Sequence, residues 1–585
     1  MRQGMIASMP KSKKRVSGKA GKRKGRRPTA RRAASDALAG AAARQEAIFR
    51  DTIHEAVSAI PEEYRVDRVT DPLEAVVPLE ATRLAIEGLG RNYAQAMGGY
   101  SWLFWLRRLP SMVFSGGLAS SGPYWRALAE VMSSWTTSPE HFGDKSFRSV
   151  IPAISDSQLE PLMKLCSIAR LLGTVHSVIR RAGKGESVRW LRHGLPLPVP
   201  DPELDQMISL YDERHLSQAG FRAGTQPFRF QPFFTKLIEP GSWEQFSLVV
   251  HELPEISPVP YWRGPVSAVK STRIRPGQFI AGLMTTANLR SLLASSEDIT
   301  IWQESRRLTS LLILLRVLFL ITFIEGFGSE WNALPSVGYL VIPSADLVEG
   351  IQARLSTVSA DLLEIMPGSV ASDAGQVLAD VAAIEARPWP LARGPILRVA
   401  GAQTAIDVNA ATYRVDELMT LPGRDGGALV NARGSHFEQH VQEMIDQTAW
   451  APKSPLREFC RKTLRLNGSR ITDVDALAVS GSTALLVSCK SIPFTYEYDG
   501  GDYRTVRNVR TLIEQADVEW QQRVDRIRQE KSGDNYDFEG YDVYGVVCTP
   551  FVVFAHRPQT RVIIQRMDRF LRATCSVTEL VGFLV

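Results

Sequence analysis

The sequence is poor in cysteine, and its cysteines form no recognisable pattern. Five are spread over 585 residues, and no two stand in a Cys-x-x-Cys pair. An odd, widely spaced set predicts neither a disulfide framework nor a tetrahedral zinc site, so a reducing cytoplasm is the expected compartment. The five are Cys166, Cys460, Cys489, Cys548 and Cys575.

Other signatures are missing as well. The chain contains no glycine-rich phosphate loop, no clustered histidine ligands and no repeat in the range of roughly 20–50 residues. Its longest apolar run, residues 311–324, carries Arg316 near the centre. A spanning helix needs roughly twenty apolar residues, so we expect a buried core helix there and no membrane association. The basic N-terminus is not followed by an apolar segment, which argues against a secretory signal.

The excess of positive over negative charge is confined to one end of the chain. The formal net charge is +7, yet 13 of the 69 basic residues lie within residues 1–34, where there is no acid. The remaining body has 56 basic residues against 62 acidic ones and is therefore negative. Such a basic run cannot bury apolar surface, so we predict a disordered tail. The tail suits sequence-independent attraction to phosphates, or it is a solvated tail without a dedicated partner.

The length predicts several domains, since 585 residues exceed what one core accommodates. Residues 35–425 show mostly helical apolar spacing, with helices expected over 159–182 and 309–324. This predicts a mainly α-helical region, either as one unit or as two subdomains, whose role the pattern does not reveal. A looser stretch, residues 421–427, is typical of a linker.

The pattern changes in the last part, residues 430–585. An amphipathic helix opens near Gly434 and is followed by a strand over 462–466, a turn at Asn467-Gly468 and a strand over 470–479. A third strand over 483–490, a long helix over 505–530 and a strand over 541–548 come next, with a strand-and-helix segment at 561–585. A crossover helix between the third and fourth strands predicts that those two strands are parallel.

Polar residues gather on two of these strands. Asp473 and Asp475 are two apart, so one strand projects both to the same face, and Ser488 and Lys490 share a face of the next strand. Pairing of the strands would bring carboxylates and an ammonium together. Phosphodiester hydrolysis uses such a set, because carboxylates hold Mg²⁺ and a lysine orients the attacking water or stabilises the developing charge.

This pattern resembles the PD-(D/E)XK, or restriction-endonuclease-like, nuclease superfamily over about residues 430–555. The resemblance implies an α/β domain with an αβββαβ core, in which Asp475 and Lys490 match the conserved aspartate and lysine positions. Glu438 matches the glutamate that many members carry on the opening helix. The implied catalytic set is Asp475, Lys490, Ser488 and Glu438, and the implied metal ligands for Mg²⁺ (or Mn²⁺) are Asp475, Glu438 and Asp473.

Ser488 departs from the family, which has an acid or glutamine at this position. A hydroxyl is a weak Mg²⁺ ligand, so Asp473 or Glu438 supplies the missing carboxylate, Ser488 binds metal through water, or cleavage has been lost and binding kept. Structural alternatives exist too. Ser435 and Glu438 could form a capping box at the helix start, and Asp473 could be a solvated strand-edge residue.

The long helix predicts nucleic-acid contacts from Arg507, Arg510 and Gln515. Acidic neighbours on the same helix predict, equally, a solvated charged face.

The leading hypothesis is a cytoplasmic, Mg²⁺-dependent endonuclease acting on DNA or RNA, DNA foremost, in a prokaryotic defence, mobile-element or repair setting. One alternative is a catalytically degenerate nuclease-fold protein that binds nucleic acid. Another is a scaffold whose helical region holds a partner protein or a second copy of the chain.

Overall fold

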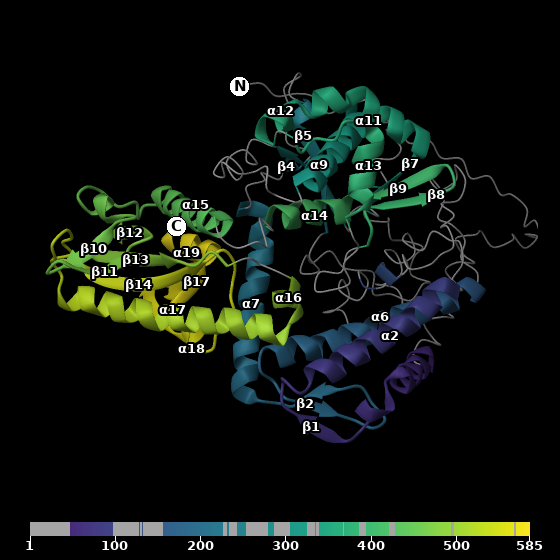
Figure 1. The fold of residues 1–585 in the computed structure, drawn as a ribbon, viewed down its shortest axis with the longest axis horizontal. Helices are drawn as coiled ribbons and strands as arrows, with labels where there is room; N and C mark the ends of the chain where they lie inside the picture. Colours follow the sequence, from purple (N-terminus) through teal and green to yellow (C-terminus); the bar gives the residue numbers. More distant parts are fainter. Residues whose placement is uncertain are drawn as a thin grey trace, which may run out of the picture.

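The structure is a computed structural model of the full chain. It describes residues 47–96, 128, 131–132, 156–225, 231–232, 243–252, 279–285, 305–324, 334, 338–366, 368–384, 394–420, 428–492, 496–566 and 569–585. The predicted basic tail (1–34) and the predicted linker (421–427) lie outside these residues. Within them the protein is rich in helix and contains several small sheets, among them a mixed four-stranded sheet toward the C-terminus (Figure 1).

Two long helices form the first part of the described chain. They are α2 (Val76–Ala96) and α6 (Asp156–Gly183), which pack side by side, and the second confirms the helix predicted over 159–182 (Figure 1). Over Glu160–Gly183, α6 is long and apolar enough to cross a membrane, but 67% of its apolar 18-residue window is buried within the protein, and core helices pass the same test. A three-stranded sheet, β1 (Arg68–Thr70), β2 (Val188–Trp190) and β3 (Leu197–Pro198), lies beside these helices, after η1 (Glu62–Tyr64).

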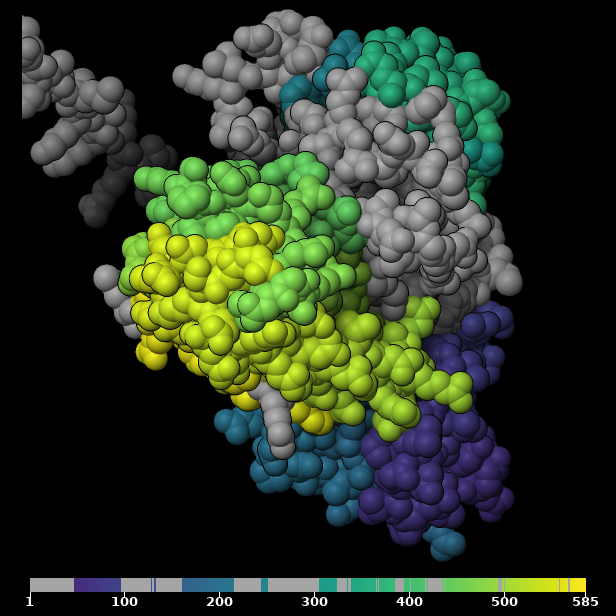
Figure 2. Space-filling view, turned by 60° about the vertical axis from the view of Figure 1, so that its left-hand side comes forward, coloured from purple at the N-terminus to yellow at the C-terminus, as the bar shows by residue number. Residues whose placement is uncertain are grey.

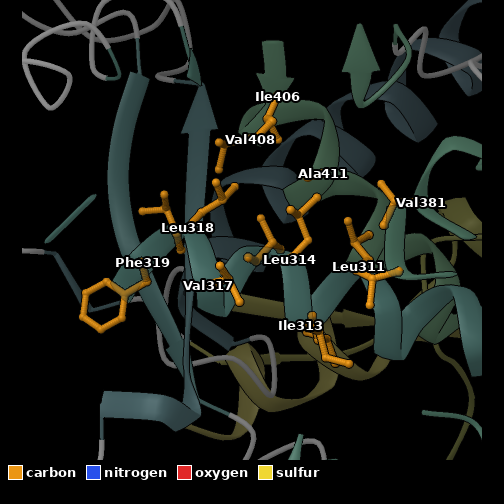
Figure 3. Close-up of a cluster of buried hydrophobic side chains, with 14 of the residues drawn as sticks. Leu311, Ile313, Leu314, Val317, Leu318, Phe319, Val381, Ile406, Val408 and Ala411 are labelled. Carbon is orange, nitrogen blue, oxygen red and sulfur yellow. The ribbon is translucent and has the colours of Figure 1, made fainter. Parts of the chain in front are cut away.

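The second part is built around α9 (Ser305–Phe319), which continues as a π-helical turn (Leu320–Ile324). This is the apolar segment predicted to be a core helix, and that prediction is confirmed: Leu311 to Leu315 are all fully buried. Figure 3 shows α9 side chains directed toward Val408 and Ala411 of α14 (Val408–Thr420). The charge of buried Arg316 is matched by Asp361, whose carboxylate lies 2.6 Å away.

Short strands surround α9, in a region where the sequence predicted mainly helices. Helical periodicity does not reveal them, because short apolar runs cannot be told from segments of a buried helix by periodicity alone. They form two three-stranded sheets with orders β4-β6-β5 and β7-β9-β8. The strands are β4 (Gln231–Pro232), β5 (Phe246–Glu252), β6 (Phe279–Thr285), β7 (Tyr339–Pro343), β8 (Leu397–Ala400) and β9 (Gln403–Asp407); the helices are η4 (Trp243–Gln245), α11 (Ser344–Val358), α12 (Ala360–Ile365) and α13 (Ala374–Ala382).

The C-terminal part contains the mixed sheet, in the order β12-β13-β14-β17. β12 and β13 form an antiparallel pair, and β13 and β14 are parallel, as the crossover helix predicted. The order of elements is α15 (Ala428–Asp446), η8 (Leu456–Phe459), β10 (Thr463–Leu466), β11 (Ser469–Asp473), β12 (Ala476–Ser480), β13 (Thr483–Cys489), α16 (Tyr496–Gly500), α17 (Tyr503–Gln529), β14 (Asp542–Thr549), α18 (Arg557–Thr560), β15 (Val562–Arg566), β16 (Arg569–Arg572), β17 (Thr574–Ser576) and α19 (Val577–Leu584).

The strand predicted over 470–479 is wrong as a single strand. β11 ends at Asp473 and pairs with β10, whereas β12 begins at Ala476 and joins the large sheet. The turn at Asn467-Gly468 is confirmed, and both residues adopt the positive φ (51° and 74°) that a tight hairpin turn requires. Because the chain changes sheets around Asp475, strand parity does not place Asp473 and Asp475 on a common face.

Helices cover both faces of the mixed sheet. One face packs against α17, whose Val506, Ile513 and Trp520 form a buried stripe at helical spacing. Asp502 caps this helix by accepting the Thr505 N–H at 2.8 Å. The opposite face packs against α15 and α19 through Phe437, Val441 and Phe583 among others.

The last helix of the first part, α7 (Pro202–Thr225), docks on the C-terminal part (Figures 1 and 2). Ile208 and Tyr211 belong to the same buried cluster as the α17 face of the sheet. Arg214, only 7% exposed, forms an ion pair with Glu579 of α19 at 2.7 Å. Residues from the first part therefore complete the core of the C-terminal domain.

Candidate active site at the edge of the C-terminal sheet

Asp475 lies at the edge of the mixed sheet, in the short link between β11 and β12. Its Oδ2 accepts the backbone N–H of Cys489 at 2.6 Å, and the Ser488 hydroxyl lies near enough to lower the pKa of its carboxyl. Both groups belong to the end of β13. Asp475 is thus joined to the strand that carries Ser488 and leads into Lys490, and the predicted meeting of these three residues is observed.

The environment of Asp475 opposes its ionisation. Burial is the main cause and raises the pKa of this carboxyl, while the Cys489 N–H, the Lys490 ammonium and the Ser488 hydroxyl act in the opposite direction. A carboxylate in such surroundings gains from a nearby cation, since the cation offsets the desolvation of its charge.

Glu438 approaches the same edge from α15. The helix begins at Ala428, well before Ser435, so the capping-box interpretation of Glu438 is wrong, because neither residue stands at a helix start. The pKa of Glu438 is raised, first by burial and then by the charge of Asp475, while Arg461 and Lys490 lower it. Glu438 and Asp475 therefore repel each other electrostatically when both are ionised.

Lys490 follows directly on β13 and is half-buried. Its backbone N–H donates to the Cys548 carbonyl at 2.8 Å, which extends the parallel pairing of β13 and β14 by one residue. Among the residues that the structure describes, no carboxylate forms an ion pair with its ammonium. The ammonium is therefore available to an anionic ligand, while its charge still acts on Asp475 and Glu438.

Asp473 is engaged differently. Its carboxylate accepts a hydrogen bond from Thr463 and forms an ion pair with Arg470. Within the described parts of the chain, no group of three or more His, Cys, Asp or Glu side chains is placed to hold a metal ion. Asp475 and Glu438 are thus the two acids beside Lys490 that are not already ion-paired.

A cavity of about 160 Å³ opens between β13 and α17. Ser488 and Lys490 line it from the strand, and Gln515, Glu519 and Arg523 line it from the helix. Glu519 accepts from Arg523 at 3.1 Å. Sequence reasoning did not assign Glu519 to the site, although its spacing from Gln515 and Arg523 places all three on one helix face.

The predicted nucleic-acid contacts on α17 fall in three environments. Gln515 lies in the cavity, and Arg507 is exposed to solvent. Arg510 is half-buried, and its Nη1 lies 3.2 Å from Nε2 of His556. Burial, followed by the charge of Arg510, lowers the pKa of His556. Arg510 therefore contributes to internal packing as well as to the surface of α17.

The assembled groups are two carboxylates, a hydroxyl and an ammonium, beside an amide and a third carboxylate across the cavity, and such groups can bind a divalent cation and an anionic ligand. Comparison of the chain with protein families, with curated proteins and with solved structures finds no match. The functional assignment therefore rests on the geometry and chemistry of the residues around Asp475.

Proposed function

We propose that the C-terminal domain is a divalent-metal-dependent nuclease that hydrolyses phosphodiester bonds of nucleic acid, DNA foremost, and that it belongs with the restriction-endonuclease-like proteins. One observation carries the proposal. Asp475 is held against the end of β13 by the Cys489 N–H, beside Ser488, where the Lys490 ammonium is unpaired among the described residues and the Glu438 carboxyl shares its electrostatic environment.

The residues at this edge fit Mg²⁺ or Mn²⁺. Their donors are carboxylate oxygens, which hard divalent cations prefer, and Mg²⁺ is commonly held by one or two carboxylates together with waters and substrate phosphates. Asp475 and Glu438 both have pKa values raised by burial, and a bound cation would relieve the repulsion between them. When bound, the cation would polarise a phosphoryl oxygen and lower the pKa of a coordinated water.

The side chains then divide the remaining work. Asp475 and Glu438 hold the cation, and the Ser488 hydroxyl lowers the pKa of Asp475 and so favours its ionised form. Lys490 orients the attacking water or stabilises the negative charge that develops on the phosphoryl group. Glu519 lines the same cavity as Ser488 and provides an acid where Ser488 replaces the one expected from the family pattern.

A second function, nucleic-acid binding without cleavage, is favoured by one observation. No three potential ligands converge among the described residues, so the site lacks a preassembled cage for a metal ion. Binding without cleavage is the alternative outcome of the experiment below.

The experiment measures cleavage of supercoiled plasmid, linear duplex, single-stranded DNA and RNA by the full chain, with Mg²⁺, with Mn²⁺ and with a chelator. We expect metal-dependent cleavage that Asp475→Asn abolishes and Glu519→Gln weakens, with binding retained. Asp542→Asn is the matched control, since Asp542 is exposed at the opposite end of the sheet, where it pairs with Thr483. Absence of cleavage of every substrate by the wild type would eliminate the nuclease proposal.

A further inference from the structure

A basic surface lies on the two-stranded ribbon formed by β15 and β16. Together with α18 before it, the ribbon covers residues 557–572, which contain five arginines and one acid, Asp568. The ribbon is anchored by Ile564 and Leu571, which are 9% and 1% exposed and belong to the core under α15 and α19. The ribbon is therefore a fixed part of the domain, and Gln565, Arg566, Arg569 and Phe570 are exposed to solvent.

Two arginines face each other where the ribbon turns. Arg566 pairs in register with Arg569, and both are exposed. Like charges directly opposite on neighbouring strands destabilise a ribbon. No described carboxylate forms an ion pair with either: Arg566 lies over the Trp450 ring, 4.2 Å from its centroid, and Arg569 donates to the Gly582 carbonyl at 3.3 Å. Arg561, by contrast, is neutralised by Asp517 at 2.6 Å.

An aromatic ring accompanies this charge. Phe570 follows Arg569 and is 50% exposed, so part of its ring is open to a ligand. Arg572 lies over its ring, 4.7 Å from the centroid. Positive charges spaced along a backbone groove and an exposed ring for a base are the features by which proteins bind nucleic acid without reading its sequence.

The turn of the ribbon lies at the opposite end of the sheet from the candidate active site. The carbonyl of Trp450, under Arg566, accepts the N–H of Val479 at 2.8 Å, and Val479 pairs with Ala484 near the start of β13. Lys490 is six residues further along, which corresponds to about 20 Å of strand. A ligand on Arg566 and Arg569 therefore contacts the protein well away from the groups proposed for hydrolysis.

We propose that the β15–β16 ribbon is a phosphate-backbone docking surface for nucleic acid, separate from the cleavage site. The inference rests on the proposed function only in its choice of partner, because it concerns binding and not hydrolysis. The ribbon contributes affinity through Arg566 and Arg569, and Phe570 adds stacking on unpaired bases.

The test compares Arg566→Gln/Arg569→Gln with the wild type in the binding of a labelled duplex of about 20 base pairs, two helical turns, over a range of salt concentrations. Loss of two phosphate contacts should weaken binding about tenfold and make the slope of log K against log salt less negative by about 2. The matched control is Arg68→Gln/Arg189→Gln, which removes the same charge from exposed positions on β1 and β2. The control should keep the wild-type slope. Melting temperatures verify that all variants fold.

Several results would overturn the proposal. They are a wild type that binds neither duplex nor single strand, a ribbon variant with the wild-type slope, or an equal loss in the control. Binding of anionic phospholipid vesicles that is lost in the ribbon variant, with duplex binding unchanged, would assign the surface to a membrane instead. Phe570→Ala should weaken binding of single strands more than of duplex. The readout is binding and not hydrolysis, so failure of the nuclease proposal leaves the result for the ribbon interpretable.

Discussion

Gly545 on β14 determines how closely α17 approaches the sheet, and its substitution by alanine is a sharp test of the site. An added Cβ would lie 2.5 Å from Cγ2 of Val524 and 3.0 Å from Nε1 of Trp520, both below ordinary van der Waals contact. Val524 and Trp520 are 0% and 1% exposed. Neither side chain has free space to enter, so α17 must move away from β14.

The displacement has two consequences. Overpacking of a dense core costs about 1–3 kcal/mol of folding free energy. It also shifts Gln515 and Glu519, which line the cavity from the same helix, relative to Lys490. Because a misplacement of about 1 Å can lower an enzymatic rate roughly a hundredfold, activity should fall even where the protein remains folded.

Urea denaturation and single-turnover cleavage of Gly545→Ala measure both effects. The control is Gly540→Ala, at φ 82° with no atom within 4 Å of an added Cβ. It introduces backbone strain of about 1 kcal/mol without displacing α17. We expect both variants to be destabilised and only Gly545→Ala to lose activity. An unchanged denaturation midpoint for Gly545→Ala, or an equal loss of activity in the control, would refute the role given to the α17–β14 contact.

Three further predictions concern charged and hydrogen-bonding groups. The pKa of Glu438 is raised in the folded protein, so ionisation of Glu438 destabilises the metal-free fold as pH rises through that pKa. Glu438→Gln should therefore raise the melting temperature at pH 7 but not near pH 4, which is below the unfolded-state pKa of about 4.3. A gain that does not depend on pH would contradict this cause. Ser488→Ala removes the hydroxyl that lowers the pKa of Asp475, so the acidic limb of the pH–rate profile should move to higher pH, and an unmoved limb would contradict this influence of Ser488. Arg214→Met removes the nearly buried ion-pair partner of Glu579 and should destabilise the protein by about 3 kcal/mol. A double-mutant cycle with Glu579→Gln that shows no coupling energy would contradict the role of this ion pair in the docking of α7.

Local patterns in the sequence predicted much of the C-terminal domain. The apolar stripe of α17 and the Asn467-Gly468 turn are local signals, and both elements form as expected. The parallel pairing of β13 and β14 followed from the connection between them. Parallel neighbours need a crossover of a dozen or more residues, usually a helix, whereas antiparallel neighbours are commonly joined by a short turn.

What failed depends on the path of the chain in three dimensions. Val474, fully buried, continues the alternation of apolar residues, so nothing local marks the change of sheet at Asp475. The approach of Glu519 to Ser488 results from packing of α17 across β13, which residue spacing along the chain does not encode. The short strands around α9 and the contribution of α7 to the C-terminal core were not predicted either, because both depend on contacts between segments far apart in the sequence.

The single-turnover rate of Lys490→Ala at saturating nucleic acid tests the central claim most directly. Lys490 makes no ion pair among the described residues, so its removal should leave the fold and the affinity for nucleic acid close to those of the wild type. If its ammonium acts on the reacting phosphoryl group, the rate should fall by roughly a hundredfold or more, the usual effect of losing one electrostatic contact to the transition state. A rate within about threefold of the wild type, which is less than 1 kcal/mol of barrier, would contradict the account.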